Sequence, residues 1–172
     1  RVDRIIPTTG APTSGGGGII QTVFGEKSGE VTITTTTFQD TGLNATITPK
    51  FNTSKILVII DQPYHMSRST DKCSGGFKVL RGSTEIATPN GTGGSGGTSP
   101  YACSFEFAGS TSASIIDRWT WMKLDEPNTT SSILYKVQMA CQTGNNSGRI
   151  RAQYGGTSGA QKGHITLMEI SA

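Results

Sequence analysis

Residues 133–141, Ile-Leu-Tyr-Lys-Val-Gln-Met-Ala-Cys, place one apolar series on every second position, with polar or smaller side chains between. Because successive side chains of a strand point to opposite faces, this alternation predicts a half-buried β-strand. Residues 55–60, Lys-Ile-Leu-Val-Ile-Ile, form a continuous apolar run instead. Such a run is typical of a strand that is covered on both faces, so we expect it to be the most buried strand.

Outward from these two stretches, strand-like runs recur at short intervals, and turn residues close each one. We expect strands at 19–24, 30–38, 43–48, 77–81, 84–87, 101–107, 113–124, 149–154 and 163–170, and a turn at 25–29. Gly82-Ser83 is a two-residue connection typical of a β-hairpin. The final apolar run should be packed in a sheet, because free chain ends usually fray. The pattern contains no convincing helix and predicts an all-β, antiparallel β-sandwich, with a jelly roll as the leading architecture.

Two segments differ from the rest in composition. Residues 1–18 contain two prolines and five glycines with few apolar side chains, which predicts an N-terminal arm followed by a domain at 19–172. The arm carries Arg1, Val2, Arg4, Ile5 and Ile6, which we expect to form an anchor. Because the first residue is Arg1 and not Met, we also expect further sequence before it. Residues 88–100 are rich in Gly, Ser, Thr and Pro and predict a long surface loop.

The composition limits the possible functions. Apolar residues make up 33% of the 172 residues, so the core should be thin and self-association is a natural source of further stability. The net charge of +3 is spread along the chain, without the basic cluster that nucleic-acid binding needs. No run approaches the roughly 20 apolar residues of a membrane-spanning helix. Cys73, Cys103 and Cys141 are widely spaced and fit buried free thiols formed in a reducing cytosol.

Short sequence phrases along nearly the whole chain resemble one group of proteins. They occur in the following order: residues 2–8, 15–21, 43–49, 54–58, 80–84, 124–127, 130–138 and 165–170. Together they are similar to virion proteins of marine and cyanobacterial phages, namely the C-terminal modules of tail fibres, head fibres or capsid-mounted spikes. The resemblance implies a homotrimer of jelly rolls, broadly like the tumour-necrosis-factor and C1q folds, held to the particle by its N-terminal segment. It implies no catalytic residue and no cofactor.

Five residues are candidates for ligand binding: Trp119, Trp121, Tyr101, His65 and Asn90. Trp119 and Trp121 share one face of a strand, which is either an exposed sugar-stacking platform or, as we favour, part of the core or of a subunit contact. His65 could join Asp61 or Cys73 in a metal site, but a loop histidine with ordinary partners is the favoured interpretation.

Four carboxylates at strand ends are candidates for the two acids of a glycosidase: Asp117, Asp125, Glu126 and Glu169. Such an enzyme needs two acids at a defined separation, and no motif supplies them. We therefore predict a protein without enzymatic activity, cofactor or bound metal.

The sequence thus predicts a non-enzymatic phage structural protein, either a fibre or spike subunit or a capsid decoration. We expect a virion location after assembly in the host cytoplasm, with the arm contacting capsid, tail or fibre-shaft proteins. Distal loops at 61–76 and 88–103 would meet a host surface glycan or outer-membrane protein. The alternative is a secreted or cell-surface lectin or adhesin that uses Trp119 and Trp121. No nucleic acid or membrane insertion is expected.

Overall fold

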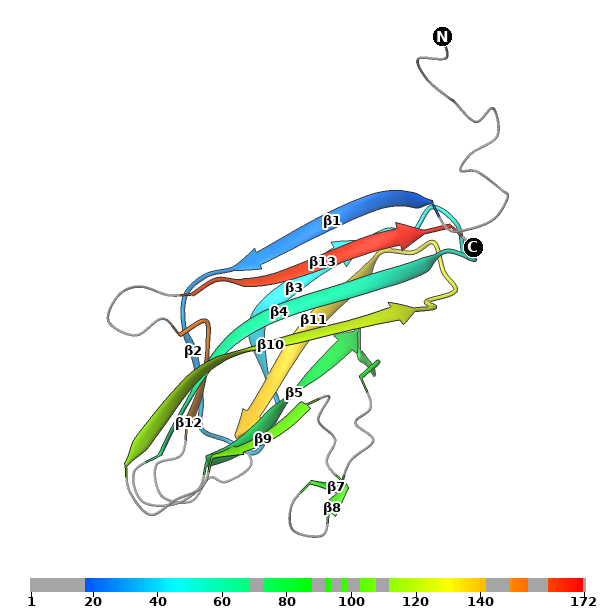
Figure 1. Cartoon of the computed structure of the whole chain (residues 1–172). Coiled ribbons are helices and arrows are strands. Elements are labelled where there is room, and N and C mark those ends of the chain that lie inside the picture. Colours follow the sequence, from blue (N-terminus) through cyan, green and yellow to red (C-terminus); the bar gives the residue numbers. More distant parts are fainter. Residues whose placement is uncertain are drawn as a thin grey trace.

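The computed structural model describes residues 18–68, 73–87, 92–93, 97–98, 103–107, 112–141, 149–154 and 161–171. Two antiparallel sheets face each other, and the described residues contain no helix (Figure 1). The fold is therefore the all-β sandwich that the alternating patterns predict. No helix in this part of the chain is long and apolar enough to cross a membrane.

The first sheet contains six strands around one long central strand. Its order is β1-β13-β4-β12-β2, and β10 pairs with the other edge of β4. The strands are β1 (Ile19–Lys27), β2 (Val31–Ile33), β4 (Lys55–Arg68), β10 (Ala113–Asp125), β12 (Arg149–Ala152) and β13 (Gly163–Ile170).

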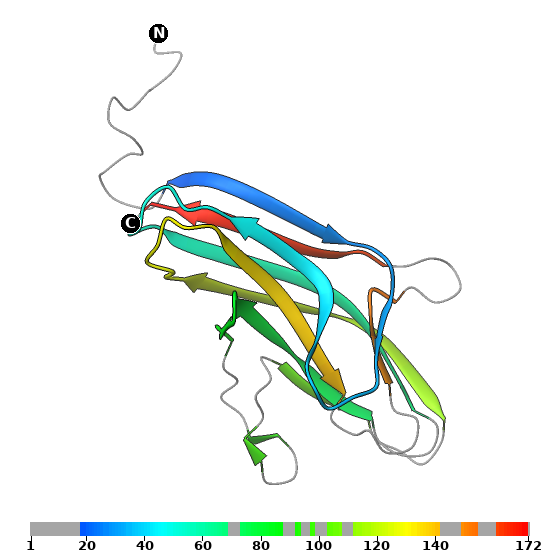
Figure 2. The ribbon, with the colours of Figure 1, turned by 180° about the vertical axis from the view of Figure 1, so that it is seen from behind.

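The second sheet lies behind the first in Figure 1 and in front of it in Figure 2. Its order is β3-β11-β5-β6, with β9 also paired to β5. The strands are β3 (Gln39–Ile47), β5 (Cys73–Arg81), β6 (Thr84–Glu85), β9 (Cys103–Phe107) and β11 (Ile133–Cys141). A separate two-residue ladder joins β7 (Thr92–Gly93) to β8 (Gly97–Thr98).

The core lies between the sheets and follows the period of two. In β11 the side chains of Tyr135, Val137 and Met139 are fully buried, as the alternation predicts. In β4 the even-numbered residues Ile56, Val58 and Ile60 are fully buried, whereas the odd-numbered ones between them are partly exposed. The prediction that residues 55–60 are covered on both faces is therefore met on one face only in the single chain.

Several predicted elements are confirmed. The strands at 113–124, 133–141 and 163–170 lie within one residue of the observed β10, β11 and β13. Gly82-Ser83 does turn the chain between β5 and β6, and Gly82 takes the left-handed φ of 59° that glycine tolerates. The last strand is packed, since β13 lies between β1 and β4. Cys73 and Cys141 are buried and form no disulfide.

Other predictions were wrong. The Thr-rich segment 30–38 forms a strand only at Val31–Ile33, because side chains 34–37 are exposed on both sides and have no face to bury. Residues 25–27 continue β1 and are not part of a turn. The expected loop at 61–76 is mostly strand, since β4 runs to Arg68 and β5 begins at Cys73.

Proline is tolerated inside β4 because of a change of partner. On that edge of β4, β13 pairs as far as Asp61 and β12 pairs from Tyr64 onward. Pro63 lies between the two ladders, where a missing N–H breaks no regular pair. Its carbonyl still accepts a hydrogen bond from the backbone N–H of Gln153 at 3.0 Å. The long strand thus continues through Pro63 into the segment that was expected to be a loop.

The two ends of the described domain are held together. The backbone N–H of Ser171 donates to the Gly18 carbonyl at 3.0 Å, and the Gly18 N–H donates to Ser171 Oγ at 3.1 Å. These residues mark the proximal end of the sandwich. β12, the end of β4 and the start of β10 lie at the opposite, distal end (Figure 1).

Candidate interaction surface

The outer face of the first sheet, which points away from the second sheet, carries a continuous group of apolar side chains. Strand register places Phe24 beside Thr166, Thr166 beside Ile59, and Ile59 beside Met122. The neighbouring row contains Met168, Leu57 and Leu124, and the next contains Ile19 and Ile170. We call this set the apolar face: Ile19, Phe24, Leu57, Ile59, Met122, Leu124, Met168 and Ile170.

Four of the eight residues of the apolar face are strongly exposed in the single chain, and the other four are partly exposed. The exposed fraction is 65% for Met122, 60% for Phe24, 61% for Ile19 and 46% for Leu124. An antiparallel sheet normally keeps one face apolar for the core and one face polar for water. A connected group of large exposed apolar side chains on the second face therefore indicates an interaction site.

The outer face of the second sheet shows the ordinary pattern and makes the contrast clear. There Lys136 and Gln138 both contact Asp40, at 3.1 and 2.7 Å. Leu134 is the large exposed apolar side chain on β11, with an exposed fraction of 39%. The apolar character thus belongs to the outer face of one sheet and not to the whole surface.

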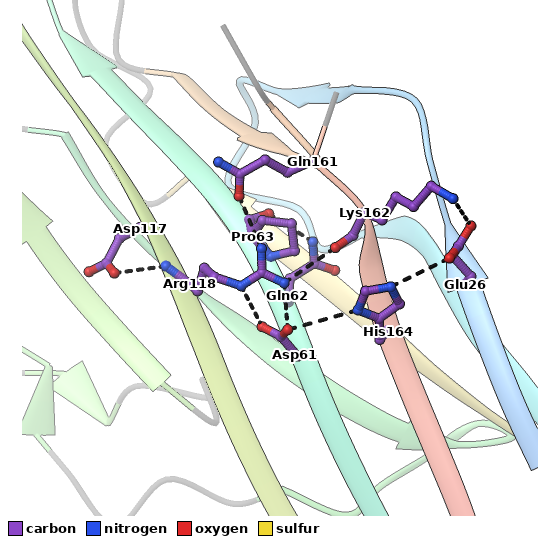
Figure 3. Close-up of polar contacts among 9 residues, drawn as sticks. All are labelled: Glu26, Asp61, Gln62, Pro63, Asp117, Arg118, Gln161, Lys162 and His164. Carbon is purple, nitrogen blue, oxygen red and sulfur yellow. Dashed lines mark hydrogen bonds and ion pairs between the residues drawn. The ribbon is translucent and has the colours of Figure 1, made fainter. Parts of the chain in front are cut away.

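A row of charged side chains borders the apolar face on its distal side (Figure 3). Arg118 of β10 donates from Nε to Asp61 Oδ1 at 2.9 Å and forms a second bond to the same carboxylate. His164 of β13 lies between two carboxylates, 3.5 Å from Glu26 and 3.9 Å from Asp61. Lys162 closes the row with an ion pair to Glu26 at 2.7 Å.

The charges in this row are mutually compensated. The hydrogen bond from Lys162 lowers the pKa of Glu26, and the hydrogen bond to Asp61 raises the pKa of Arg118 further above its usual range. Phe24 stacks on the His164 ring with centroids 5.4 Å apart, so the row is in direct contact with the apolar face. An apolar centre with a paired polar border is the usual anatomy of a protein–protein interface.

At the proximal side, a second ion pair borders the same face. Lys55 Nζ lies 2.7 Å from Glu126 Oε1, and this contact lowers the pKa of Glu126. Lys55 is paired in register with Ile170, which belongs to the apolar face. The surface is therefore limited along the strands by charged pairs at both ends.

The described residues among those predicted from the sequence to bind a ligand do not form one site. Trp119 is buried in the core with 8% exposure and stacks on Phe77 at 4.7 Å, and Trp121 packs partly buried beside it. Burial of Trp119 removes it from any sugar-stacking platform. His65 is not in a loop: it lies on β4 with 5% exposure. Tyr101, Asn90 and the arm residues Arg1, Val2, Arg4, Ile5 and Ile6 lie outside the described part of the chain.

The candidate catalytic carboxylates have separate surroundings. Asp125 accepts hydrogen bonds from Tyr135 Oη at 2.7 Å and from Arg81 Nη1 at 2.9 Å. Glu126 is paired with Lys55, and Asp117 accepts from the backbone N–H of Arg118. Among the described residues, no group of three or more His, Cys, Asp or Glu side chains could hold a metal ion.

Glu169 is fully buried and joins three parts of the fold. Its carboxylate accepts from Gln21 Nε2 at 2.6 Å and from the backbone N–H groups of Lys50 and Phe51 at 2.7 and 3.3 Å. Burial alone would raise its pKa, but these hydrogen bonds outweigh burial and lower the pKa below 4.5. Glu169 therefore ties β13 to β1 and to the turn after β3.

Glu169→Gln should lower the free energy of unfolding at pH 7 by about 2 kcal/mol, because an amide cannot accept all these hydrogen bonds. A lowered folded-state pKa means that the carboxylate stabilises above pH 4.5 and loses this effect as pH falls through the folded pKa. The difference between native protein and variant should thus narrow below pH 4.5 in urea titrations. Glu85→Gln changes a partly exposed carboxylate and should keep the native dependence of the free energy of unfolding on pH. If this dependence became equally weak in both variants, the role assigned to Glu169 would be contradicted.

Sequence reasoning missed the apolar face. One signal was present, namely the continuous run at 55–60, whose odd-numbered residues Leu57 and Ile59 form the centre of the face. Met122 and Met168 join them only through strand pairing. No protein-family model matches the chain, and no curated protein matches it either.

Proposed function

We propose that this chain is a non-enzymatic structural subunit of a bacteriophage particle, which forms a homotrimer through the apolar face and contributes to attachment at the host surface. The observation that carries self-association is the exposure of Met122, Phe24 and Leu124 on one sheet face. Burying such a face against identical copies would remove apolar area from water and add stability to a small core.

The assignment to a phage particle and the choice of a trimer over other oligomers come from the sequence resemblance, which covers nearly the whole chain. The strand orders support the finer jelly-roll assignment, because the chain crosses repeatedly between sheets: β3, β5 and β11 lie in one, and β4, β10 and β13 in the other. In this proposal the proximal end, with Gly18, continues into the anchoring arm. The distal end then faces away from the particle.

The lectin or adhesin alternative depended on an exposed pair of tryptophans. Trp119 stacks inside the core on Phe77, so only the partly buried Trp121 remains for such a platform. The apolar face, in contrast, needs a partner of comparable size. We therefore favour the structural subunit.

Light scattering or sedimentation of the purified chain at micromolar concentration should give the mass of a trimer. Met122→Glu should shift this mass toward the monomer, because a carboxylate within a buried apolar contact weakens association by about tenfold or more. Met122 is 65% exposed in the single chain, so the variant should fold normally.

Leu134→Glu is the matched control, since Leu134 is also an exposed apolar residue but lies on the outer face of the second sheet. It should keep the native mass. A native chain that is a well-folded monomer, or two variants that dissociate equally, would exclude the apolar face as the contact.

A further inference from the structure

Beyond Pro63, the outer face of the first sheet gains basic side chains, while Ile116 of β10, which is paired with His65, remains an exposed apolar side chain there. There β12 replaces β13 beside β4, and strand register pairs Arg149 with Ser67 and Arg151 with His65. Directly paired residues share a face, so all four side chains belong to the outer face at the distal end. We call these four residues the distal basic patch.

The two arginines differ in their partners. Arg151 Nε lies 3.3 Å from Glu30 Oε1, and its guanidinium lies over the Tyr154 ring at 4.9 Å. Arg149 is exposed and donates from Nε to Ser67 Oγ at 3.0 Å. Within the described residues, no carboxylate forms an ion pair with Arg149. Its remaining N–H groups are thus an available fork for an oxyanion.

His65 provides a second, independent observation. It is 5% exposed, and its Nδ1 has no hydrogen-bond partner among the described residues. Its ring packs on Tyr154 with centroids 4.1 Å apart. A buried polar atom without a partner costs about 1–3 kcal/mol, so its presence beside two arginines points to a ligand that supplies the missing hydrogen bond.

The electrostatic surroundings of His65 favour an anion. Burial lowers its pKa, and the charges of Arg151 and Arg149 lower it further, while Glu30 opposes them. The neutral ring lies in a positive potential that Glu30 does not cancel, and it can donate one N–H hydrogen bond. The ring is therefore suited to support a bound oxyanion without carrying charge itself.

We propose that the distal basic patch binds a sulfate or phosphate ester of a polysaccharide, with Arg149 as the principal cation and Ser67 and His65 as neutral hydrogen-bond donors. The patch lies at the end of the sandwich opposite Gly18 and Ser171 (Figure 1). Its role as a host-attachment site rests on the proposed function, whereas its affinity for an oxyanion does not.

Calorimetry of the full chain with heparin, as a sulfated polysaccharide, tests this proposal. Arg149→Met keeps the stem of an exposed side chain and should weaken binding by about tenfold, the effect of one charge-assisted interaction. Lys50→Met removes an equal charge from an exposed position at the proximal end and should leave binding unchanged. Competition by inorganic phosphate would support the oxyanion site.

Equal binding of desulfated heparin, or an equal loss in the Arg149 and Lys50 variants, would overturn the proposal in favour of unspecific attraction to a basic protein. The outcome is separable from self-association. If the chain is a monomer and binds heparin through Arg149, the oxyanion site is retained and the trimer is excluded. If the chain is a trimer and its heparin binding does not depend on Arg149, the trimer is retained and the oxyanion site is excluded.

Discussion

Gly75→Ala should destabilise the fold by about 3 kcal/mol and lower Tm by about 10 °C in a domain of this size. Gly75 lies on β5 and faces the interior, where β12 of the other sheet approaches it. A Cβ at this position would overlap Ile150 Cδ1 and the backbone carbonyl oxygen of Ala140. The methyl can rotate away, but the carbonyl belongs to the β11 ladder and cannot.

Thermal unfolding followed by circular dichroism measures this effect. Gly75→Ala combined with Ile150→Val removes Cδ1 and should recover only part of the loss, because the overlap with Ala140 remains. Gly82→Ala is the comparison: the space around Gly82 is open, and only its φ of 59° resists a side chain, at a cost of about 1 kcal/mol. A larger effect at Gly82 than at Gly75 would contradict the packing argument.

Asp125→Ala should cost about 3 kcal/mol, because it removes the acceptor shared by the buried Tyr135 hydroxyl and the partly exposed Arg81 guanidinium. The exposed side-chain fraction is 7% for Asp125 and 26% for Arg81, and Tyr135 is fully buried. Arg81 keeps one weaker bond, to the Glu126 carbonyl at 3.2 Å. Urea denaturation of the variant should show a lower midpoint with an unchanged slope.

A double-mutant cycle separates the two donors. Tyr135→Phe alone should cost about 1 kcal/mol, and its effect should shrink in the Asp125→Ala background, because the shared hydrogen bond is already lost. Glu126→Ala changes the neighbouring, exposed carboxylate and should leave the urea midpoint nearly unchanged. Additive losses for Asp125 and Tyr135 would show that the hydrogen bond is not the stabilising interaction.

The fold class was predictable because local alternation carries it. The strand at 133–141 buries one face along its whole length, so its period of two is visible without any knowledge of neighbours. The Thr-rich segment 30–38 has the same period, but its apolar series ends at Ile33, and the rest of it is not a strand. A run of threonines indicates β-propensity, but a stable strand also needs apolar side chains that it can bury on one face.

The candidate surfaces were not predictable, because they arise from pairing between distant segments. Phe24, Ile59 and Met122 become neighbours only when β1, β13, β4 and β10 are in register. Likewise, Arg151 reaches His65 because β12 takes over beside β4 after Pro63. A single sequence contains each residue but not the pairing that places them side by side.

The length of β4 has a mechanical consequence. This strand of 14 residues runs from the proximal to the distal end, and β10 pairs with it from Asp125 to Ala113. A pulling force between the two ends of the sandwich acts along these strands, so it loads the hydrogen bonds of the ladder in shear and all at once. Peeling the bonds apart singly would need a force across the strands. The domain is thus suited to resist tension along its long axis, which is the direction of load in the attachment role proposed above.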